Sequence, residues 1–425
     1  MKTLNFTIIA VILIIEIYGN SFAQSGWISQ NSNTNSTLRS VFFISDQIGW
    51  ITGGNSSNDS GKVLKTTNGG INWIIKSIGT SPVYSVFFIS STSGWIAADD
   101  GKILKTEDGG TNWVVQSNTG SSHRTVQFVS SLNGWVISRG AVQLKTTNSG
   151  LNWTSIILST YNDGFFISGA VGWIVGGNIK KTTDGGNNWN TQYSGGIYTV
   201  HRAVNFLSSS IGWVAGDDGN YATVLKTTNG GDNWSSFQTS QTESFFDIQF
   251  IDANTGWSIG QDQIPNKKIF RSTNGGANWE LQTNGSGIIN ALYMLNVNTG
   301  WAVGENGIIL KTTNSGITPV GINIEKNNIS GHFSLEQNYP NPFNPTTKIK
   351  FDIPDIPLRR GVGGMMVTIK IYDALGREVA VLVNSALQSG TYEVDWNASQ
   401  FPSGIYFYKL ETPEFSDVKK MVLLR

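Results

Sequence analysis

Three arginines recur at one position of a repeated sequence unit and could bind an anion together. Arg39, Arg124 and Arg202 each stand ten residues before the glycine of a recurring Gly-Trp pair, and Tyr84 holds the same position in another copy. A guanidinium presents several N–H donors in one plane and pairs well with a carboxylate, sulfate or phosphate. These four residues are the candidate ligand-binding site.

Two carboxylates at the next position leave the role of these arginines open. Asp163 and Asp247 could serve as counter-charges, in which case the arginines cap strand ends and pair with them. Otherwise the arginines hold the anion of a ligand. A glycosidase needs two carboxylates roughly 5–9.5 Å apart. Asp163 and Asp247 belong to repeats two units apart, which places them beyond the shorter spacing.

The composition offers little other catalytic chemistry. There is no cysteine, which excludes disulfides, thiolate metal sites and cysteine nucleophiles. The repeat region holds the histidines His123 and His201, without the clustering that a metal site needs. We therefore expect no catalytic residue, no cofactor and no metal. Lys+Arg and Asp+Glu number 29 each, so no net charge attracts nucleic acid.

The elements that position the arginines come from the repeat itself. The Gly-Trp pair occurs seven times, with its glycine at 49, 94, 134, 172, 212, 256 and 300. Each unit contains four β-branched and aromatic runs separated by polar turns, and such a period is typical of a β-propeller blade. A small residue stands four positions after each glycine, as at Gly53, and we expect it to let neighbouring blades approach closely.

A second motif predicts how the ring closes. Lys-Thr-Thr-Asn-Gly-Gly-x-Asn-Trp, as at 65–73, ends in tryptophan in six copies, and the copy that begins at Lys311 lacks it. The missing strand is supplied by the segment around Trp27. We therefore predict seven blades, with the N-terminal strand completing the last one and covering its edge. The side chain of Asn68 and its equivalents is expected to stabilise the turn rather than to bind calcium.

The N-terminus predicts export. Lys2 precedes an apolar run from Phe6 to Ile15, and small residues at Ser21 and Ala23 fit a signal peptide of residues 1–23 cleaved after Ala23. The run is too short to span a bilayer comfortably, and no other segment is apolar enough. We expect no stable transmembrane segment, with an uncleaved anchor as the alternative.

The repeat stops after Pro319, and a different module follows. Residues 319–332 are polar and are expected to form a linker. Residues 333–425 alternate strand-like runs with glycine-centred turns, which predicts a small immunoglobulin-like β-sandwich. Pro354 to Met366 is expected to be an inserted flexible loop. The whole chain is therefore predicted to be all-β.

Two resemblances follow from these motifs. Residues 24–318 resemble the photosystem II assembly/stability-factor family of seven-bladed propellers, and the turn motif resembles the Asp-box of bacterial neuraminidases. The blocks beginning at Gln337, Val367, Ser403 and Lys419 resemble the type A C-terminal sorting domain of the type IX secretion system. That resemblance implies Sec export to the periplasm, recognition by the outer-membrane translocon and its sorting machinery, and release or display at the cell surface.

The leading functional hypothesis is a non-enzymatic propeller, secreted or displayed at the cell surface, that binds a protein or a glycan. One alternative is a carbohydrate-active enzyme of the Asp-box type. Another is an assembly factor for a membrane complex, but a sorting domain that directs the protein across the outer membrane conflicts with it.

Overall fold

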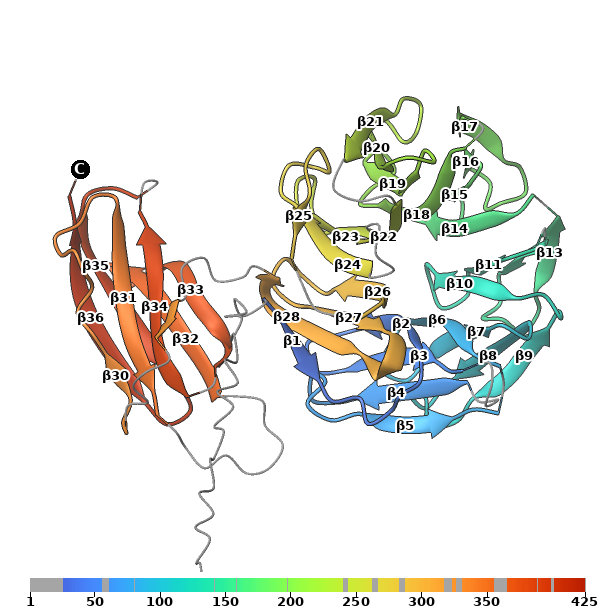
Figure 1. Ribbon diagram of the computed structural model, residues 1–425. Coiled ribbons are helices and arrows are strands. Elements are labelled where there is room, and N and C mark those ends of the chain that lie inside the picture. Colours follow the sequence, from blue (N-terminus) through green and yellow to red (C-terminus); the bar gives the residue numbers. More distant parts are fainter. Residues whose placement is uncertain are drawn as a thin grey trace, which may run out of the picture.

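The computed structural model has two all-β units (Figure 1). It describes residues 26–424 apart from 56–60, 80, 141, 158, 197, 240–243, 262–266, 283–286, 317–322, 326–330, 355–364, 388 and 399–400. The predicted signal peptide with its cleavage site at Ala23 lies outside the described residues, and so does most of the loop expected between Pro354 and Met366.

Residues 26–316 form a ring of four-stranded antiparallel sheets, which confirms the predicted β-propeller (Figure 1). Blades 1 to 6 are each built from four consecutive strands. Blades 1 to 3 comprise β2 (Leu38–Phe43), β3 (Gly49–Gly53), β4 (Lys62–Thr66), β5 (Ile74–Ser77); β6 (Val83–Phe88), β7 (Gly94–Ala98), β8 (Lys102–Thr106), β9 (Val114–Asn118); and β10 (His123–Phe128), β11 (Gly134–Ser138), β12 (Val142–Thr146), β13 (Thr154–Ile157).

Blades 4 to 6 repeat this order. They comprise β14 (Tyr161–Phe166), β15 (Gly172–Gly176), β16 (Asn178–Thr182), β17 (Asn190–Ser194); β18 (Val200–Phe206), β19 (Gly212–Asp217), β20 (Ala222–Thr227), β21 (Ser235–Thr239); and β22 (Ser244–Phe250), β23 (Gly256–Gln261), β24 (Lys267–Ser272), β25 (Glu280–Leu281). The first strand of each blade lies innermost and packs on the first strand of the next blade all around the ring.

Blade 7 joins the two ends of the propeller. It contains β26 (Ile289–Met294), β27 (Gly300–Gly304) and β28 (Ile309–Gly316), with the short 3-10 helix η1 (Glu305–Gly307) between the last two. The N-terminal strand β1 (Gly26–Gln30) pairs antiparallel with β28, as predicted. A strand from the start of the chain therefore covers the edge that β28 would otherwise expose.

The Gly-Trp pair links neighbouring blades through stacked rings. Trp50 of blade 1 stacks on Phe88 of blade 2 with ring centroids 3.5 Å apart, and Trp301 of blade 7 stacks on Phe43 of blade 1 at 3.4 Å. The same stacking joins Trp95 to Phe128, Trp135 to Phe166, Trp173 to Phe206 and Trp213 to Phe250. The glycine is required because a Cβ on Gly49 would overlap the ring of Phe43.

The second motif forms a hydrogen-bonded turn, as predicted. Thr66 Oγ1 donates to Asn68 Oδ1 at 3.0 Å and accepts from the N–H of Gly70 at 2.9 Å, while the N–H of Asn72 donates to Asn68 Oδ1 at 2.9 Å. Where the motif carries a carboxylate, as in Asp108, the same backbone N–H bond holds its pKa at about 2. The motif thus stabilises the turn from within.

The second unit is a β-sandwich, again as predicted. One sheet has the order β29 (Asn323–Glu325), β34 (Gly390–Asn397), β31 (Thr346–Ile353), β30 (Ser334–Leu335), and the other β33 (Glu378–Leu387), β32 (Met365–Asp373), β35 (Gly404–Glu411), β36 (Ser416–Leu423). Phe351, Ile369 and Tyr408 are fully buried in the core between them. Part of the expected linker at 319–332 forms β29, which covers the edge of β34.

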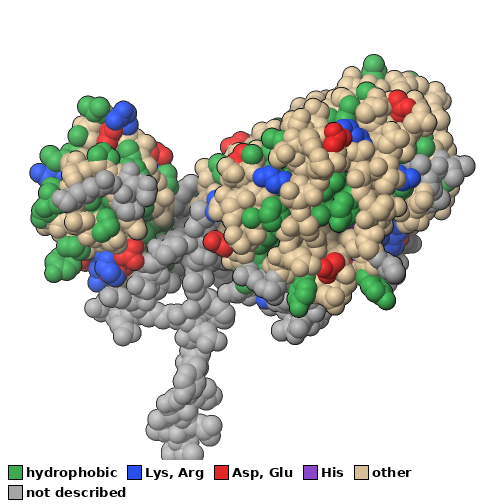
Figure 2. All heavy atoms as spheres, turned by 90° about the horizontal axis from the view of Figure 1, so that it is seen from above, with side chains coloured by type: hydrophobic (Ala, Val, Ile, Leu, Met, Phe, Trp, Pro, Cys, Tyr) green, Lys and Arg blue, Asp and Glu red, His purple; other side chains and the backbone are tan. Residues whose placement is uncertain are grey.

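The surface is polar but sparsely charged. Charged residues make up only 14% of the chain, and Figure 2 shows them as a few small groups spread over the surface, with no large patch of one sign on this face. Within the described ranges, no helix has the length and apolarity needed to cross a membrane.

Candidate functional site

Each predicted rim residue occupies a β-bulge in the innermost strand of its blade. The pairing with the second strand shifts register once, at the same place in every blade. The extra residues are Arg39, Tyr84, Arg124, Asn162, Arg202, Phe246 and Asn290. A bulge bends the strand and re-aims its side chain. The repeat therefore presents seven half-buried side chains at one end of the innermost strands.

The small residues after each Gly-Trp serve this bulge, which corrects the prediction made for them. A Cβ on Gly53 would overlap the carbonyl oxygen of Thr37, and one on Gly216 would overlap that of Val200. Both carbonyls belong to the same blade as the glycine. The small residue therefore makes room for the bulged strand beside it rather than for a neighbouring blade.

Two of the rim arginines stack on the rim residue of the next blade. The Cζ atom of Arg39 lies 4.7 Å from the ring centroid of Tyr84, and that of Arg202 lies 4.7 Å from the ring centroid of Phe246. A guanidinium over an aromatic face at this distance is an attractive cation–π contact. These arginines therefore help to hold neighbouring blades together.

The rim asparagines tie blades together through the backbone. Asn162 Nδ2 donates to the carbonyl oxygen of His201 at 2.8 Å, and Asn290 Nδ2 donates to that of Leu38 at 3.0 Å. In each case the acceptor directly precedes the bulge residue of the next blade. The rim position thus has a structural role in several blades.

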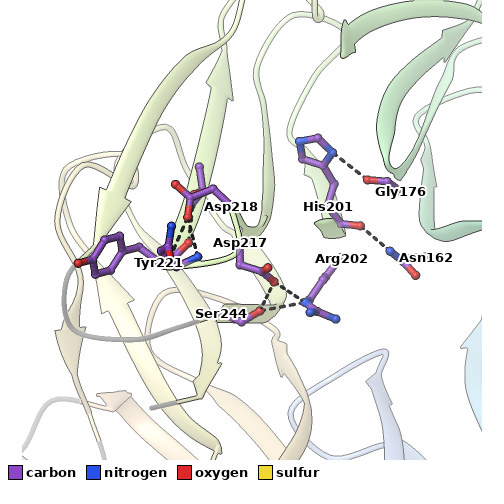
Figure 3. A network of polar contacts seen from close by, with 10 residues as sticks. Asn162, Gly176, His201, Arg202, Asp217, Asp218, Tyr221 and Ser244 are labelled. Carbon is purple, nitrogen blue, oxygen red and sulfur yellow. Dashed lines mark hydrogen bonds and ion pairs between the residues drawn. The ribbon is translucent and has the colours of Figure 1, made fainter. Parts of the chain in front are cut away.

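Arg202 is neutralised by a carboxylate of its own blade (Figure 3). Its Nε lies 2.9 Å from Asp217 Oδ2 and 2.9 Å from Ser244 Oγ, and Ser244 Oγ donates to Asp217 Oδ2 at 2.7 Å. The ion pair is shielded, since the side chain of Asp217 is 12% exposed. The strand-capping interpretation therefore describes Arg202, with Asp217 rather than Asp163 or Asp247 as its carboxylate.

The two carboxylates expected as counter-charges form hydrogen bonds to neighbouring blades. Asp163 accepts from Thr125 Oγ1 at 3.0 Å and from the N–H of Val204 at 3.1 Å, and Asp247 accepts from the N–H of Leu292 at 3.1 Å. Val204 and Leu292 both belong to the following blade. Burial, with a smaller effect of the Asp247 charge, raises the pKa of Asp163 to about 7. These hydrogen bonds give both carboxylates a role in joining blades.

Arg124 differs from the other rim arginines. Within the described part of the chain its guanidinium makes no hydrogen bond or ion pair, although the residue is half-buried. Its pKa is lowered by burial first and then by the positive charge of Arg139, with a further contribution from Arg202. Tyr84 and the carboxylate of Asp163 act in the opposite direction, but neither forms an ion pair with Arg124, so this underpaired cation favours the arrival of an anion.

Arg139 was not among the predicted site residues. It is exposed, and it stands five residues after the glycine of Gly-Trp at the end of β11. The same position carries Asp99, Asp217 and Glu305 in other blades, so charge at this second aligned position was the signal that could have revealed it. The candidate site is the cationic pair of Arg124 and Arg139 in blade 3; the charge of Arg202 also acts on Arg124, but Arg202 is paired with Asp217.

This pair can bind an anion, and the chemistry it can offer beyond binding is limited. Guanidinium groups suit carboxylate, sulfate and phosphate oxygens. Among the described residues no group of three or more His, Asp and Glu side chains could hold a metal ion.

The fold and site define a class: an all-β propeller with a cationic rim, followed by a β-sandwich. The comparison with known protein families assigns each of the two units to a more specific group. Residues 78–164 match the family described as photosynthesis system II assembly factor YCF48, and residues 337–424 match the secretion system C-terminal sorting domain. The chain therefore resembles YCF48 in its propeller and ends in a sorting domain of the type IX secretion system, which implies a secreted or outer-surface protein.

Solved structures agree on the fold. "YCF48 bound to D1 peptide" has a TM-score of 0.57 at 18% identity and covers 68% of this chain and 97% of its own. YCF48 from Cyanidioschyzon merolae scores 0.55 at 16% identity, covering 67% of this chain and 98% of its own. PorZ, a surface component of the type IX secretion system of Porphyromonas gingivalis, scores 0.51 at 14% identity, covering 91% of this chain and 59% of its own. Among curated proteins, no sequence matches the chain.

Proposed function

We propose that the propeller is a non-enzymatic binding module of an exported protein, and that its cationic rim pair of Arg124 and Arg139 holds an anionic group of a protein or glycan ligand. One observation carries the proposal: Arg124 is half-buried, its pKa is lowered by burial and by the charge of Arg139, and it has no ion-pair partner among the described residues. Keeping a partly desolvated cation without a partner is costly, and a ligand anion would offset that cost.

Export has its own support. The C-terminal match to a sorting domain implies an extracellular or outer-surface location, and the predicted signal peptide would supply the first step of the route. Among the proteins of similar fold, PorZ is a bacterial surface component and YCF48 has been solved bound to a D1 peptide. Propellers of this fold therefore occur both at a bacterial surface and in a complex with a peptide.

A binding role is favoured over catalysis by how the ionisable rim groups are used. Both oxygens of Asp163 accept hydrogen bonds, Asp247 accepts a backbone N–H, and Asp217 is paired with Arg202. A hydrolase needs a carboxylate that is available to substrate as acid, base or nucleophile. Here these carboxylates hold the blades and the rim in place.

The binding proposal can be tested with matched ligand pairs. The probes are neutral, carboxylated and sulfated oligosaccharides, and peptides with free or amidated C-termini, presented to the full chain. We expect an anionic member of a pair to bind and its neutral counterpart to bind at least about tenfold more weakly. The double variant Arg124→Gln/Arg139→Gln should abolish this preference. Arg377→Gln, which removes a charge on the sandwich, is the control. The proposal would be overturned if the double variant bound the anionic probe as tightly as the parent does, or if the protein converted a probe into a product.

Export is tested separately by fractionating the native host with and without residues 333–425. We expect the full chain in the medium or at the outer surface and the truncated chain in the periplasm. A full chain retained in the cytoplasm would contradict the export route.

A further inference from the structure

Two histidines occupy the same place in blades 3 and 5, and only one of them is satisfied. His123 and His201 each precede the bulge residue and are 0% and 3% exposed. In His123, Nδ1 lies 2.9 Å from Ser138 Oγ and Nε2 lies 3.0 Å from the carbonyl oxygen of Gly101. In His201, Nδ1 lies 2.9 Å from the carbonyl oxygen of Gly176, whereas the buried Nε2 has no hydrogen-bond partner.

The state of the His201 ring follows from its one hydrogen bond. A carbonyl can only accept, so Nδ1 of His201 carries the proton. Burial lowers the pKa of His201, so the ring is neutral near pH 7 and Nε2 presents a lone pair. In Figure 3 this second nitrogen points away from Gly176, toward the side on which Asp217 and Asp218 lie. Buried acceptors nearly always have a donor, which here must come from outside the described chain.

A cavity lies beside His201. Its volume is about 190 Å³, and it opens at the seam between blades 4 and 5 beside His201, Tyr193, Asp217, Asp218 and Gln238. Neither lysine nor arginine lines it. The N–H groups of the following loop lower the pKa of Asp218 and keep its carboxylate ionised. Gln238 Nε2 also donates to Asp218 Oδ2, and the walls add the hydroxyls of Thr199, Thr223 and Ser236. Because hydroxyls both donate and accept, a ligand with several hydroxyls suits this mixture of acceptors and donors.

The aromatic wall narrows the class of ligand. Tyr193 packs edge-on against His201, with ring centroids 5.7 Å apart at 81°. An aromatic surface next to carboxylate and imidazole acceptors suits a sugar ring, since its C–H face packs on the aromatic side chain while its hydroxyls donate. The volume would hold about six waters at roughly 30 Å³ each, which is room for a small ring rather than for a single solvent molecule.

We propose that the cavity between blades 4 and 5 binds one neutral sugar ring of a glycan, with a hydroxyl donating to His201 Nε2 and others to Asp218. Asp217 separates this cavity from the rim, because one of its oxygens bonds Arg202. The sugar site goes beyond the anion site proposed for the rim and does not depend on it.

The test follows the histidine ring nitrogens by NMR in the full chain, which contains three histidines. The probes are glucose, galactose, mannose and N-acetylglucosamine, with methylammonium and free lysine as competing donors. We expect a sugar to shift the Nε2 signal of His201 and to leave the ring signals of His123 unchanged. His201→Phe and Asp218→Ala should each weaken that sugar at least about tenfold.

Two control variants keep the outcome interpretable. Asp232→Ala removes an exposed carboxylate from the turn of the same blade and should leave sugar binding intact. Arg124→Gln should also leave it intact, so failure at the rim and failure at the cavity can be told apart. The proposal is overturned if no sugar moves the His201 signal, if Asp218→Ala binds the sugar as the parent does, or if methylammonium or lysine moves the signal in place of a sugar.

Discussion

The guanidinium carbon of Arg202 lies 4.7 Å from the ring centroid of Phe246, the residue that holds the same bulge position in the next blade. Arg39 repeats this relationship with Tyr84, also at 4.7 Å. The two pairs differ in their polar contacts. Arg202 Nε bonds Asp217, whereas the buried Nε of Arg39 has no hydrogen bond. Equivalent positions in different blades therefore contribute differently to the stability of the propeller.

That difference predicts unequal effects on stability. Arg202→Met leaves the shielded carboxylate of Asp217 without its cation, and we expect a loss of about 2 kcal/mol of unfolding free energy. Arg39→Met loses only a cation–π contact, and the new side chain can still pack on Tyr84, so we expect about 0.5 kcal/mol. Urea unfolding measures both. In Arg202→Met/Asp217→Asn much of the loss should be recovered, and an equal cost for the two single variants would contradict this account.

The buried carboxylate of Asp163 predicts a pH dependence. Its pKa is raised to about 7 in the folded chain, against about 3.9 when unfolded. A raised folded pKa gives stability that is fully present below about pH 4 and is lost as the pH rises through about 7. The unfolding free energy of Asp163→Asn, relative to that of the parent, should therefore increase by about 1–3 kcal/mol between pH 5 and pH 8.

Unfolding of parent and variant across that pH range isolates this effect. His123 and His201 titrate with the opposite sign in both proteins and cancel in the difference. Asp108→Asn is the control, because the pKa of Asp108 is about 2 and five of the seven turns carry asparagine there. A difference between Asp163→Asn and the parent that does not change with pH would refute the prediction.

Two adjacent turn glycines should respond differently to substitution. Gly109 and Gly110 have φ angles of 72° and 90°. Blade 3 carries Ser149 in the place of Gly109, at φ 62°, with its hydroxyl bonded to the carbonyl of Ser131. We therefore expect Gly109→Ser to cost less than about 1 kcal/mol, and Gly110→Ser, where every turn has glycine, to cost about 2 kcal/mol. Thermal unfolding compares them, and the reverse order would sink the argument.

The sequence could predict the ring because each blade repeats the same packing. Gly49 fits under Phe43 of its own blade and Trp50 reaches Phe88 of the next, so the motif encodes the seam between blades. The missing tryptophan of the last turn likewise predicted that the strand around Trp27 closes the ring, because one open edge needs one strand. Local repeats thus determine the architecture.

The site was harder to predict because its contacts cross strands. Arg202 meets Asp217 on the neighbouring strand, a pairing that depends on the bulge register and leaves no mark in the aligned innermost positions. Arg139 was missed for the same reason, since it lies at the end of the second strand. The unsatisfied nitrogen of His201 could not be foreseen either, because His123 has the same sequence context and is satisfied.

The unpaired charge of Arg124 gives the last prediction. Arg124→Met removes a half-buried cation whose pKa is lowered by burial and by the charges of Arg139 and Arg202, so it should relieve repulsion rather than break a bond. We expect the melting temperature to stay level or rise, with a larger gain at about 0.01 M salt than at 1 M, where charges are screened within about 3 Å. The melting temperature of Arg202→Met should be lower than that of the parent at both salt concentrations. If Arg124→Met is destabilised as strongly as Arg202→Met, then Arg124 is a structural residue of the rim, and the physical basis for an anion site at this position disappears.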